Sequence, residues 1–284
     1  MSEAVSVVTR SKNAFNYWVL DWGRVVFESV TAIGAFALFV VRTTSWLFTR
    51  LPKWETLLPN FYQVGVQSLP VIALTGTFIG MVLSVQSFSQ FEQLGLESQM
   101  GAVITMTLVR ELGPVLAAVM LAGRVGSAMA AELGTMRVTE QIDALSSMGS
   151  NPIHYLVVPR FLACLLMIPA LTVMADFMGV AGGHFFSVIV YGVDSHHYWS
   201  NARDFVGVFD IMSGIVKSIF FGAAIAMVSC YQGFHSAPGA EGVGQAATKS
   251  FVYSFIVILI LDLMIGITVE SIYRSIWTNG PRLF

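Results

Sequence analysis

Charged residues are scarce in this chain. Only 11% of its 284 residues are Asp, Glu, Lys or Arg, and 55% are hydrophobic, whereas an average soluble domain carries about 25% charged residues. The few basic residues are spread along the chain and form no basic face, which argues against a nucleic-acid partner. The composition therefore excludes an ordinary water-soluble domain and predicts an all-α integral membrane protein, because helices satisfy their backbone hydrogen bonds within lipid.

Cysteine and nucleotide-binding motifs are also nearly absent. Cys164 and Cys230 lie in apolar stretches without CxxC or Cys/His spacing, which predicts buried free thiols. The Gly-rich segment 239–244 lacks the Lys-Ser/Thr that completes a phosphate-binding loop. We expect it to form a flexible turn and the chain not to hydrolyse ATP by itself. The basic N-terminus precedes a run that contains Glu28 and no clear cleavage site, so no signal peptide is predicted.

What the chain has in abundance is apolar segments long enough to cross a bilayer, which takes about 20 residues. Five spans are predicted, over residues 62–88, 100–130, 155–191, 209–234 and 251–272. Upstream, Trp and Arg residues flank a shorter apolar stretch, 31–41, which predicts an interfacial elbow helix over 17–48, the alternative being a full first span. We therefore divide the chain into an N-terminal cytoplasmic or interfacial region, 1–58, and a transmembrane domain, 59–284.

Two local patterns predict how these helices pack and where a polar helix lies. Gly76 and Gly80 form a small-xxx-small face that allows close approach of another helix. Between the second and third spans, charged residues alternate with apolar ones over 132–151, which predicts a short amphipathic helix outside the bilayer. Its apolar members are Met136, Ile142 and Leu145.

The basic residues at the ends of the spans predict the orientation. One side of the membrane collects Arg10, Lys12, Arg24, Arg42, Arg50, Lys53, Arg137 and Lys249 if the spans alternate. The other side collects Arg203, Arg274 and Arg282. We therefore expect the N-terminus and the amphipathic interval in the cytoplasm and the C-terminus outside.

Charged residues inside the predicted spans are the first candidates for function. A charge at the bilayer centre costs roughly 3 kcal/mol on insertion scales, so it needs a partner or a polar cavity. Arg110 and Glu111 are neighbours on one helix and diverge by about 100°, so each needs its own partner. We predict the pairs Glu111–Lys217 and Arg110–Asp262. These ions could also do no more than fix the register of the helices.

Two other functions fit single features of the sequence. Arg110, Glu111, Asp176 and Asp262 could form the relay of an ion-coupled secondary transporter, although no internal repeat is evident. Ser127 in a Gly-Ser-Ala run could serve a membrane enzyme, with His184 as its base. Adjacent His196 and His197 with Asp194 are weak ligands for one ion, so no metal site is predicted.

The region from Arg110 to Pro152 gives a resemblance to a known family. The run RELGPVLAAVMLAGRVGSAMAAELGTMRVTEQIDALSSMGSNP resembles the signature region of the MlaE permeases, as do IGMVLSVQ at 79–86, IVKSIFFG at 215–222 and GVGQAATKS at 242–250. The resemblance is weakest before Asn60 and in the loop 192–204. It implies the membrane-spanning, non-catalytic permease of an ABC transporter that moves phospholipid or a similar hydrophobic molecule.

The resemblance also implies partners and sites. It implies a homodimer in the bacterial inner membrane, cytoplasmic ABC ATPases that use ATP and Mg, an MCE-domain substrate-binding protein, and no cofactor bound by this chain. The coupling helix that docks on the ATPase would contain Gly134, Thr135, Met136, Arg137, Glu140, Gln141, Asp143 and Leu145. A lipid pocket between the two copies would be lined by Phe78, Met81, Val82, Val85 and Phe88.

Overall fold

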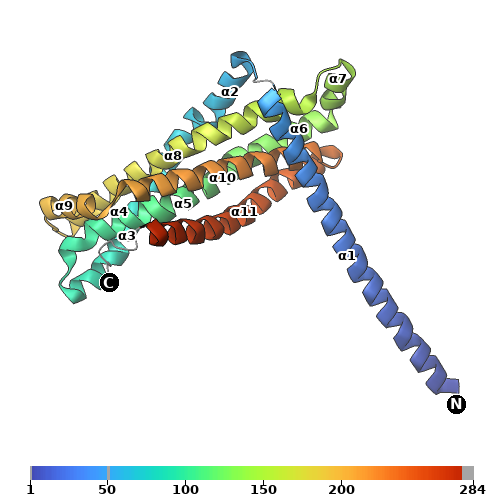
Figure 1. Cartoon of the computed structure of the whole chain (residues 1–284), viewed down its shortest axis with the longest axis horizontal. Helices are drawn as coiled ribbons and strands as arrows, with labels where there is room; N and C mark the ends of the chain where they lie inside the picture. The colour runs from blue at the N-terminus through green and yellow to red at the C-terminus, as the bar shows by residue number, and fades with distance from the viewer. Residues whose placement is uncertain (1, 50–51, 277–284) are drawn as a thin grey trace. The chain divides into compact units, whose positions relative to one another are not determined.

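The computed structural model describes residues 2–49 and 52–276, all of whose regular elements are helices (Figure 1). Arg50 and Arg282, which contribute to the charge argument for orientation, lie outside the described residues. The chain divides into two compact units, Met1–Arg50 and Leu51–Phe284. Six helical segments of the described residues are long and apolar enough to cross a membrane. The predicted all-helical membrane fold is thus confirmed.

The first unit is a single helix, α1 (Ser2–Thr49). Its part Val26–Thr49, 24 residues long, has the length and composition of a membrane span. The shorter apolar stretch 31–41 therefore belongs to a much longer helix than the sequence predicted. Its position in the interface, rather than across the bilayer, stays a prediction.

The first two predicted spans are helices interrupted by tighter and wider turns. The first consists of α2 (Trp54–Val64), the 3₁₀ turn η1 (Val66–Ser68) and α3 (Leu69–Leu94). After the 3₁₀ turn η2 (Glu97–Gln99), the second consists of α4 (Met100–Thr107), η3 (Leu108–Leu112), α5 (Gly113–Leu121), η4 (Ala122–Gly126) and α6 (Ser127–Val138). Both η3 and η4 are π-helical turns, which are rare and frequently occur at functional sites.

The remaining elements complete the bundle. They are α7 (Gln141–Ser147), η5 (Ile153–Val157), α8 (Val158–Phe185), η6 (Phe186–Val190), α9 (Ser195–Phe205), α10 (Val208–Phe234) and α11 (Gly239–Ile276). The predicted flexible turn at 239–244 is wrong, because α11 begins at Gly239. Three turns into α11, Ser250 is fully buried and donates a hydrogen bond to Ser229 of α10 at 2.8 Å.

Close packing of α3 on α8 forms the centre of the second unit, and α10 also packs on α8. A Cβ atom added to Gly76 would lie 2.7 Å from the carbonyl oxygen of Ala175, and one added to Gly80 would clash with the carbonyl of Gly179. The predicted small-xxx-small face is therefore confirmed. Cys164 and Cys230, on α8 and α10, are buried free thiols as predicted.

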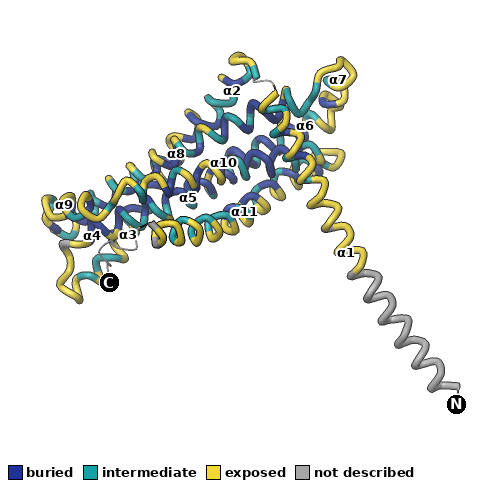
Figure 2. The backbone as a smooth tube through the Cα atoms, viewed as in Figure 1, coloured by how far each residue is buried: buried dark blue, intermediate teal, exposed yellow. Residues whose placement is uncertain are grey.

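The two ends of the second unit carry different short helices (Figure 1). At one end α9 packs on α4, where the fully buried Tyr198 joins a core cluster with Met100 and Ile104. At the other end α6 leads into α7. Figure 2 shows buried residues along the length of α8 and α10, whereas α7 and much of α11 are exposed. A face of α11 is thus left without a cover within the second unit.

Candidate functional site

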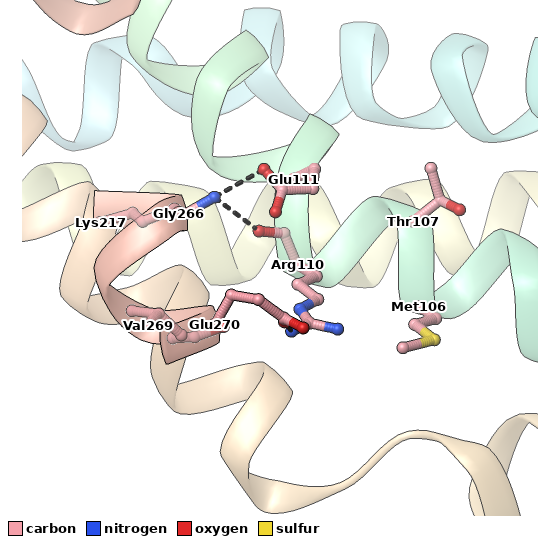
Figure 3. Close-up of a pocket in the computed structure, with 9 residues that line it drawn as sticks. Met106, Thr107, Arg110, Glu111, Lys217, Gly266, Val269 and Glu270 are labelled. Atoms are coloured by element: carbon pink, nitrogen blue, oxygen red, sulfur yellow. Dashed lines mark hydrogen bonds and ion pairs between the residues drawn. The ribbon is translucent and has the colours of Figure 1, made fainter. Parts of the chain in front are cut away.

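A charged cavity lies among three helical runs (Figure 3). Its volume is about 430 Å³, and it is lined by Met106, Thr107, Arg110, Glu111, Ser213, Lys217, Gly266, Val269 and Glu270. Arg110 and Glu111 belong to the π turn η3. Their partners come from α10 and α11, so the cavity forms only when these helices pack together.

Lys217 is the centre of the charged group. Its side chain is 1% exposed, and its Nζ lies 2.6 Å from Glu111 Oε2 and 3.0 Å from Asp262 Oδ1. Nζ also donates a hydrogen bond to the main-chain oxygen of Arg110 at 3.4 Å, which Figure 3 draws. The predicted Glu111–Lys217 pair is confirmed. A buried ammonium requires such compensation, because an unpaired charge would be strongly unfavourable there.

Arg110 points the other way and has partners that the sequence did not predict. Its Nη2 lies 2.9 Å from Glu270 Oε2, and its Nε lies 3.9 Å from Asp210 Oδ1. The predicted Arg110–Asp262 pair is wrong, since Asp262 contacts Lys217 instead. The sequence of an apolar span does not fix the rotation of the helix about its own axis. Which way an acidic side chain points is therefore decided by how the helix packs. The available signal was that Asp210 and Glu270 lie near the ends of the fourth and fifth spans, where acids are few.

The chemistry of this cavity is that of a polar site in an apolar surrounding. Four carboxylates, those of Glu111, Asp210, Asp262 and Glu270, face two cations, Arg110 and Lys217. Glu111 and Glu270 are nearly half exposed, at 48% and 43% of the side chain. The cavity can therefore hold water or a polar group while the ion pairs keep the charges compensated.

The residues predicted to line a lipid pocket divide into two groups. Phe78, Val82 and Val85 are exposed along one face of α3, at 55%, 54% and 43%, and Met81 is half-buried. Phe88 differs, because its ring stacks on Tyr191 with centroids 4.0 Å apart and packs against the core under α9. The structure thus brings the first three together on an exposed face and places the partly buried Phe88 against the core cluster at α9.

The predicted coupling helix is two helices joined at a corner. Gly134, Thr135, Met136 and Arg137 end α6, whereas Gln141, Asp143 and Leu145 belong to α7. Glu140 lies at the corner with a φ of 59°, a left-handed conformation that a non-Gly residue adopts rarely. Arg137 Nη1 spans the corner to Asp143 Oδ1 at 2.6 Å. The prediction of one short amphipathic helix within 132–151 is therefore wrong, because the helix is broken at Thr139 and Glu140.

The apolar residues of this corner also differ from the sequence prediction. Ile142 is 4% exposed, so it packs within this chain and does not project outward. Met136 and Leu145 are half-buried. The apolar side chain that is exposed most is Met148, at 71%, just after α7. A partner that docks here would therefore meet Met148 and the charged residues before it meets Ile142.

The structure brings together only part of the residues of the alternative functions: Glu111, Asp262 and the main chain of Arg110 meet at Lys217. Asp176 on α8 lies against Gly113 and does not line the charged cavity. Ser127 donates a hydrogen bond to the main-chain oxygen of Ala247 at 3.3 Å, whereas His184 contacts Ser195 at 3.1 Å. Each of the two residues thus has another hydrogen-bond partner, and Ser127 and His184 do not form a catalytic pair. At the opposite end, Asp194 caps α9 and contacts His197 at 2.6 Å.

Fold and site together define a multi-pass helical membrane protein that carries compensated charges at bilayer depth. The family model of the permease MlaE matches residues 57–268. A probable ABC transporter permease protein of Rickettsia felis is 40% identical over 243 residues, 86% of this chain and 94% of the relative. The chain belongs to the MlaE permease family of ABC transporters, and it is a non-catalytic transmembrane component of that class.

Two relatives have names that state more. The intermembrane phospholipid transport system permease protein MlaE of Haemophilus influenzae is 37% identical over 210 residues, 74% of this chain and 80% of the relative. The chloroplastic protein TRIGALACTOSYLDIACYLGLYCEROL 1 of Arabidopsis thaliana is 40% identical over 213 residues, 75% of this chain and 61% of the relative. The family thus includes bacterial and chloroplast permeases.

Proposed function

We propose that this chain moves phospholipid or a similar hydrophobic molecule in a transporter driven by a separate ABC ATPase. The family match over residues 57–268 carries the proposal, and the name of the Haemophilus relative supports a phospholipid cargo. The uncovered face of α3 formed by Phe78, Val82 and Val85 suits acyl chains, which need apolar contact without fixed polar geometry. Met81 adds an adaptable side chain at its edge.

The assembly that we propose has two copies of this chain. The exposed apolar residues of α3 and α11 would face the partner copy or the cargo. Two cytoplasmic ATPases would bind and hydrolyse ATP with Mg, and an MCE-domain protein would deliver or receive the lipid. The membrane would be the bacterial inner membrane, with the α6–α7 corner in the cytoplasm and the C-terminus outside.

The α6–α7 corner is the proposed contact with the ATPase. The Arg137–Asp143 ion pair is exposed, at 42% and 61% of the side chains, and links the end of α6 to α7. Exposed charges at the rim of an interface set its orientation, while an apolar side chain such as Met148 fills a groove. Changing Glu140 and Asp143 to Lys should abolish co-purification of the ATPase, whereas the exposed Glu55→Lys on α2 should leave it intact.

The proposed function is tested by reconstituting the complex, purified from native membrane, into liposomes that contain a fluorescent phospholipid. We expect lipid transfer that requires hydrolysable ATP and that stops when the ATPase is omitted. Transfer by this chain alone, driven by an ion gradient without ATP, would instead establish the ion-coupled secondary transporter. In that case the charged cavity with Arg110, Glu111 and Asp262 would be the ion path.

A further inference from the structure

A second group of polar contacts lies at the other half of the membrane domain, and the charged cavity does not include it. It begins at the break between α2 and α3. Gly65 interrupts the helix, and its missing side chain leaves room for Met167 of α8, whose Sδ lies 2.7 Å from where a Cβ would be. The turn η1 follows at once. The first span therefore has a joint at Gly65–Ser68 instead of a continuous helix.

Arg124 fills this joint. It extends from the π turn η4, and its Nη1 donates hydrogen bonds to Ser68 Oγ at 2.5 Å and to the main-chain oxygen of Gln63 at 3.4 Å. Its Nη2 donates to Gln67 Oε1 at 3.4 Å. Ser68 is fully buried and also bonds to the main chain of Val64. One guanidinium thus holds both sides of the joint.

A second link lies further along the same helical run. Gln63 Nε2 donates to Glu132 Oε1 at 2.9 Å, and Arg160 of α8 lies 2.9 Å from Glu132 Oε2. Arg160 is only 11% exposed, and its Nη1 is buried without a hydrogen-bond partner in the described part of the chain. Glu132 is therefore the carboxylate that compensates this guanidinium. Its loss would leave a poorly hydrated charge.

The two links together act as a clamp. Arg124 and Glu132 are eight residues apart, about 12 Å along an α-helix. Both links reach α2 at the same residue: Arg124 donates to the main-chain oxygen of Gln63, and Glu132 accepts a hydrogen bond from its side chain. Together they hold the end of α2 against the helical run of η4 and α6. Glu132 is also only six residues before Val138, where α6 ends and the corner with Glu140 begins. A displacement of the corner is therefore transmitted to α2 through the hydrogen bond between Glu132 and Gln63.

We propose that Arg124 and Glu132 are positioning residues for energy transmission: they join the broken first span to the helix that ends in the α6–α7 corner, so that both move as one body. The inference rests on the proposed function, because it takes the corner as the ATPase contact. Without the clamp, the ATPase would still displace α7, but α2 and the lipid-facing α3 would not follow.

The test measures ATP hydrolysis and phospholipid transfer in parallel, with the complex purified from native membrane. Glu132→Ala and Arg124→Gln should lower the lipid moved per ATP by ~10-fold, the equivalent of one charge-assisted hydrogen bond, while ATP hydrolysis stays within about two-fold. Glu55→Gln on the exposed side of α2 is the matched control and should leave the ratio unchanged. The exchange Glu132→Arg with Arg160→Glu should restore much of it.

A second measurement separates the clamp from the proposed cargo. Spin labels at Leu58 of α2, which is 66% exposed, and at Thr139 of the corner report the distance between the two elements. We expect one narrow distance with and without a non-hydrolysable ATP analogue, and a broad, nucleotide-dependent distribution in Glu132→Ala. Gln63→Leu removes the other partner of the same hydrogen bond and should give the same broad distribution. It replaces Glu132→Ala if that variant folds poorly.

The outcomes are distinguishable. Absence of ATP-dependent lipid transfer by the unchanged complex would overturn the proposed function, whereas the spin-label distances would still decide the clamp. An unchanged distance distribution in both variants would overturn the clamp even if transport were confirmed. Parallel loss of hydrolysis and transfer, with unchanged distances, would also overturn it, because it would show that these residues only support folding.

Discussion

At the scale of single residues, the buried Lys217 shows how charge is kept at bilayer depth. Its ammonium contacts Glu111, Asp262 and a main-chain oxygen, so each acid depends on the same cation. Arg110 forms a separate group with Glu270 and Asp210. The two groups share the π turn η3 but divide its charges between α10 and α11.

The first prediction concerns the loss of this cation. Lys217→Met leaves two carboxylates close together without compensation, and we expect the free energy of unfolding to fall by about 3 kcal/mol. The double variant Lys217→Met with Asp262→Asn should recover part of it, because it removes one of the stranded charges. Thermal unfolding in detergent measures both. Equal stability of the two variants would show that repulsion between the acids is negligible.

A second prediction concerns Tyr198, which lies outside the spans. Burial raises the pKa of Tyr198 to about 12, against an opposing effect of the Thr105 hydroxyl. The unfolded chain ionises its tyrosines near pH 10, so the folded state binds the proton more tightly, and this contribution is lost as the pH rises from about 10 to about 12. Absorbance titration at alkaline pH should show one late-ionising tyrosine that is missing in Tyr198→Phe. If the two proteins show the same ionisation near pH 12, and differ instead by one tyrosine near pH 10, the prediction is contradicted.

At the scale of the elements, contact between α3 and α8 depends on missing side chains. Gly80→Ala places a Cβ against the main chain of α8, within 2.9 Å of the amide nitrogen of Gly183. The helices must then separate, which costs about 1–3 kcal/mol. Gly244→Ala in α11 is the control, because its Cβ meets nothing within 4 Å, and it should stabilise the helix by about 0.5–1 kcal/mol. Thermal unfolding should therefore shift in opposite directions for the two variants.

The α6–α7 corner allows a prediction about strain at one position. Among the described residues, Glu140 is the non-Gly residue with a positive φ, at 59°. Gly adopts this conformation without steric cost, so Glu140→Gly should stabilise the isolated chain by up to about 1 kcal/mol. Denaturation of the purified chain measures this. If ATPase binding weakens in the same variant, the Glu140 side chain contributes to docking although its backbone is strained.

At the scale of the whole molecule, α7 and α9 lie at opposite ends of the second unit (Figure 1). Both native cysteines are buried, so a new surface cysteine can be labelled selectively. Ser147→Cys on α7 should react only with a reagent that reaches the cytoplasm, and Ser200→Cys on α9 only from outside. Reaction of Ser147→Cys from the outer side would remove the proposed ATPase contact.

The same labelling decides the role of α1. If Val26–Thr49 lies in the interface, Gly23→Cys should share the cytoplasmic accessibility of Ser147→Cys. If that segment crosses the bilayer, Gly23→Cys should react from outside instead. The helix is long enough for either arrangement, since 24 residues exceed the about 20 that a span requires.

The sequence by itself determined the features that depend on composition and local pattern. Scarcity of charge, runs of apolar residues, the small face of Gly76 and Gly80 and the need of Glu111 for a basic partner all followed from the cost of polar groups in lipid. That cost acts on every residue separately, so it can be inferred without knowing the fold.

Features that depend on helix rotation and on helix ends became visible only once the helices were packed together. Packing paired Asp262 with Lys217 and gave Arg110 the acids Asp210 and Glu270. It also extended α11 to Gly239 and divided the predicted coupling helix at Glu140. An apolar span leaves its rotation about the axis undetermined, since many faces are equally apolar, and packing against α8 and α10 removes this freedom.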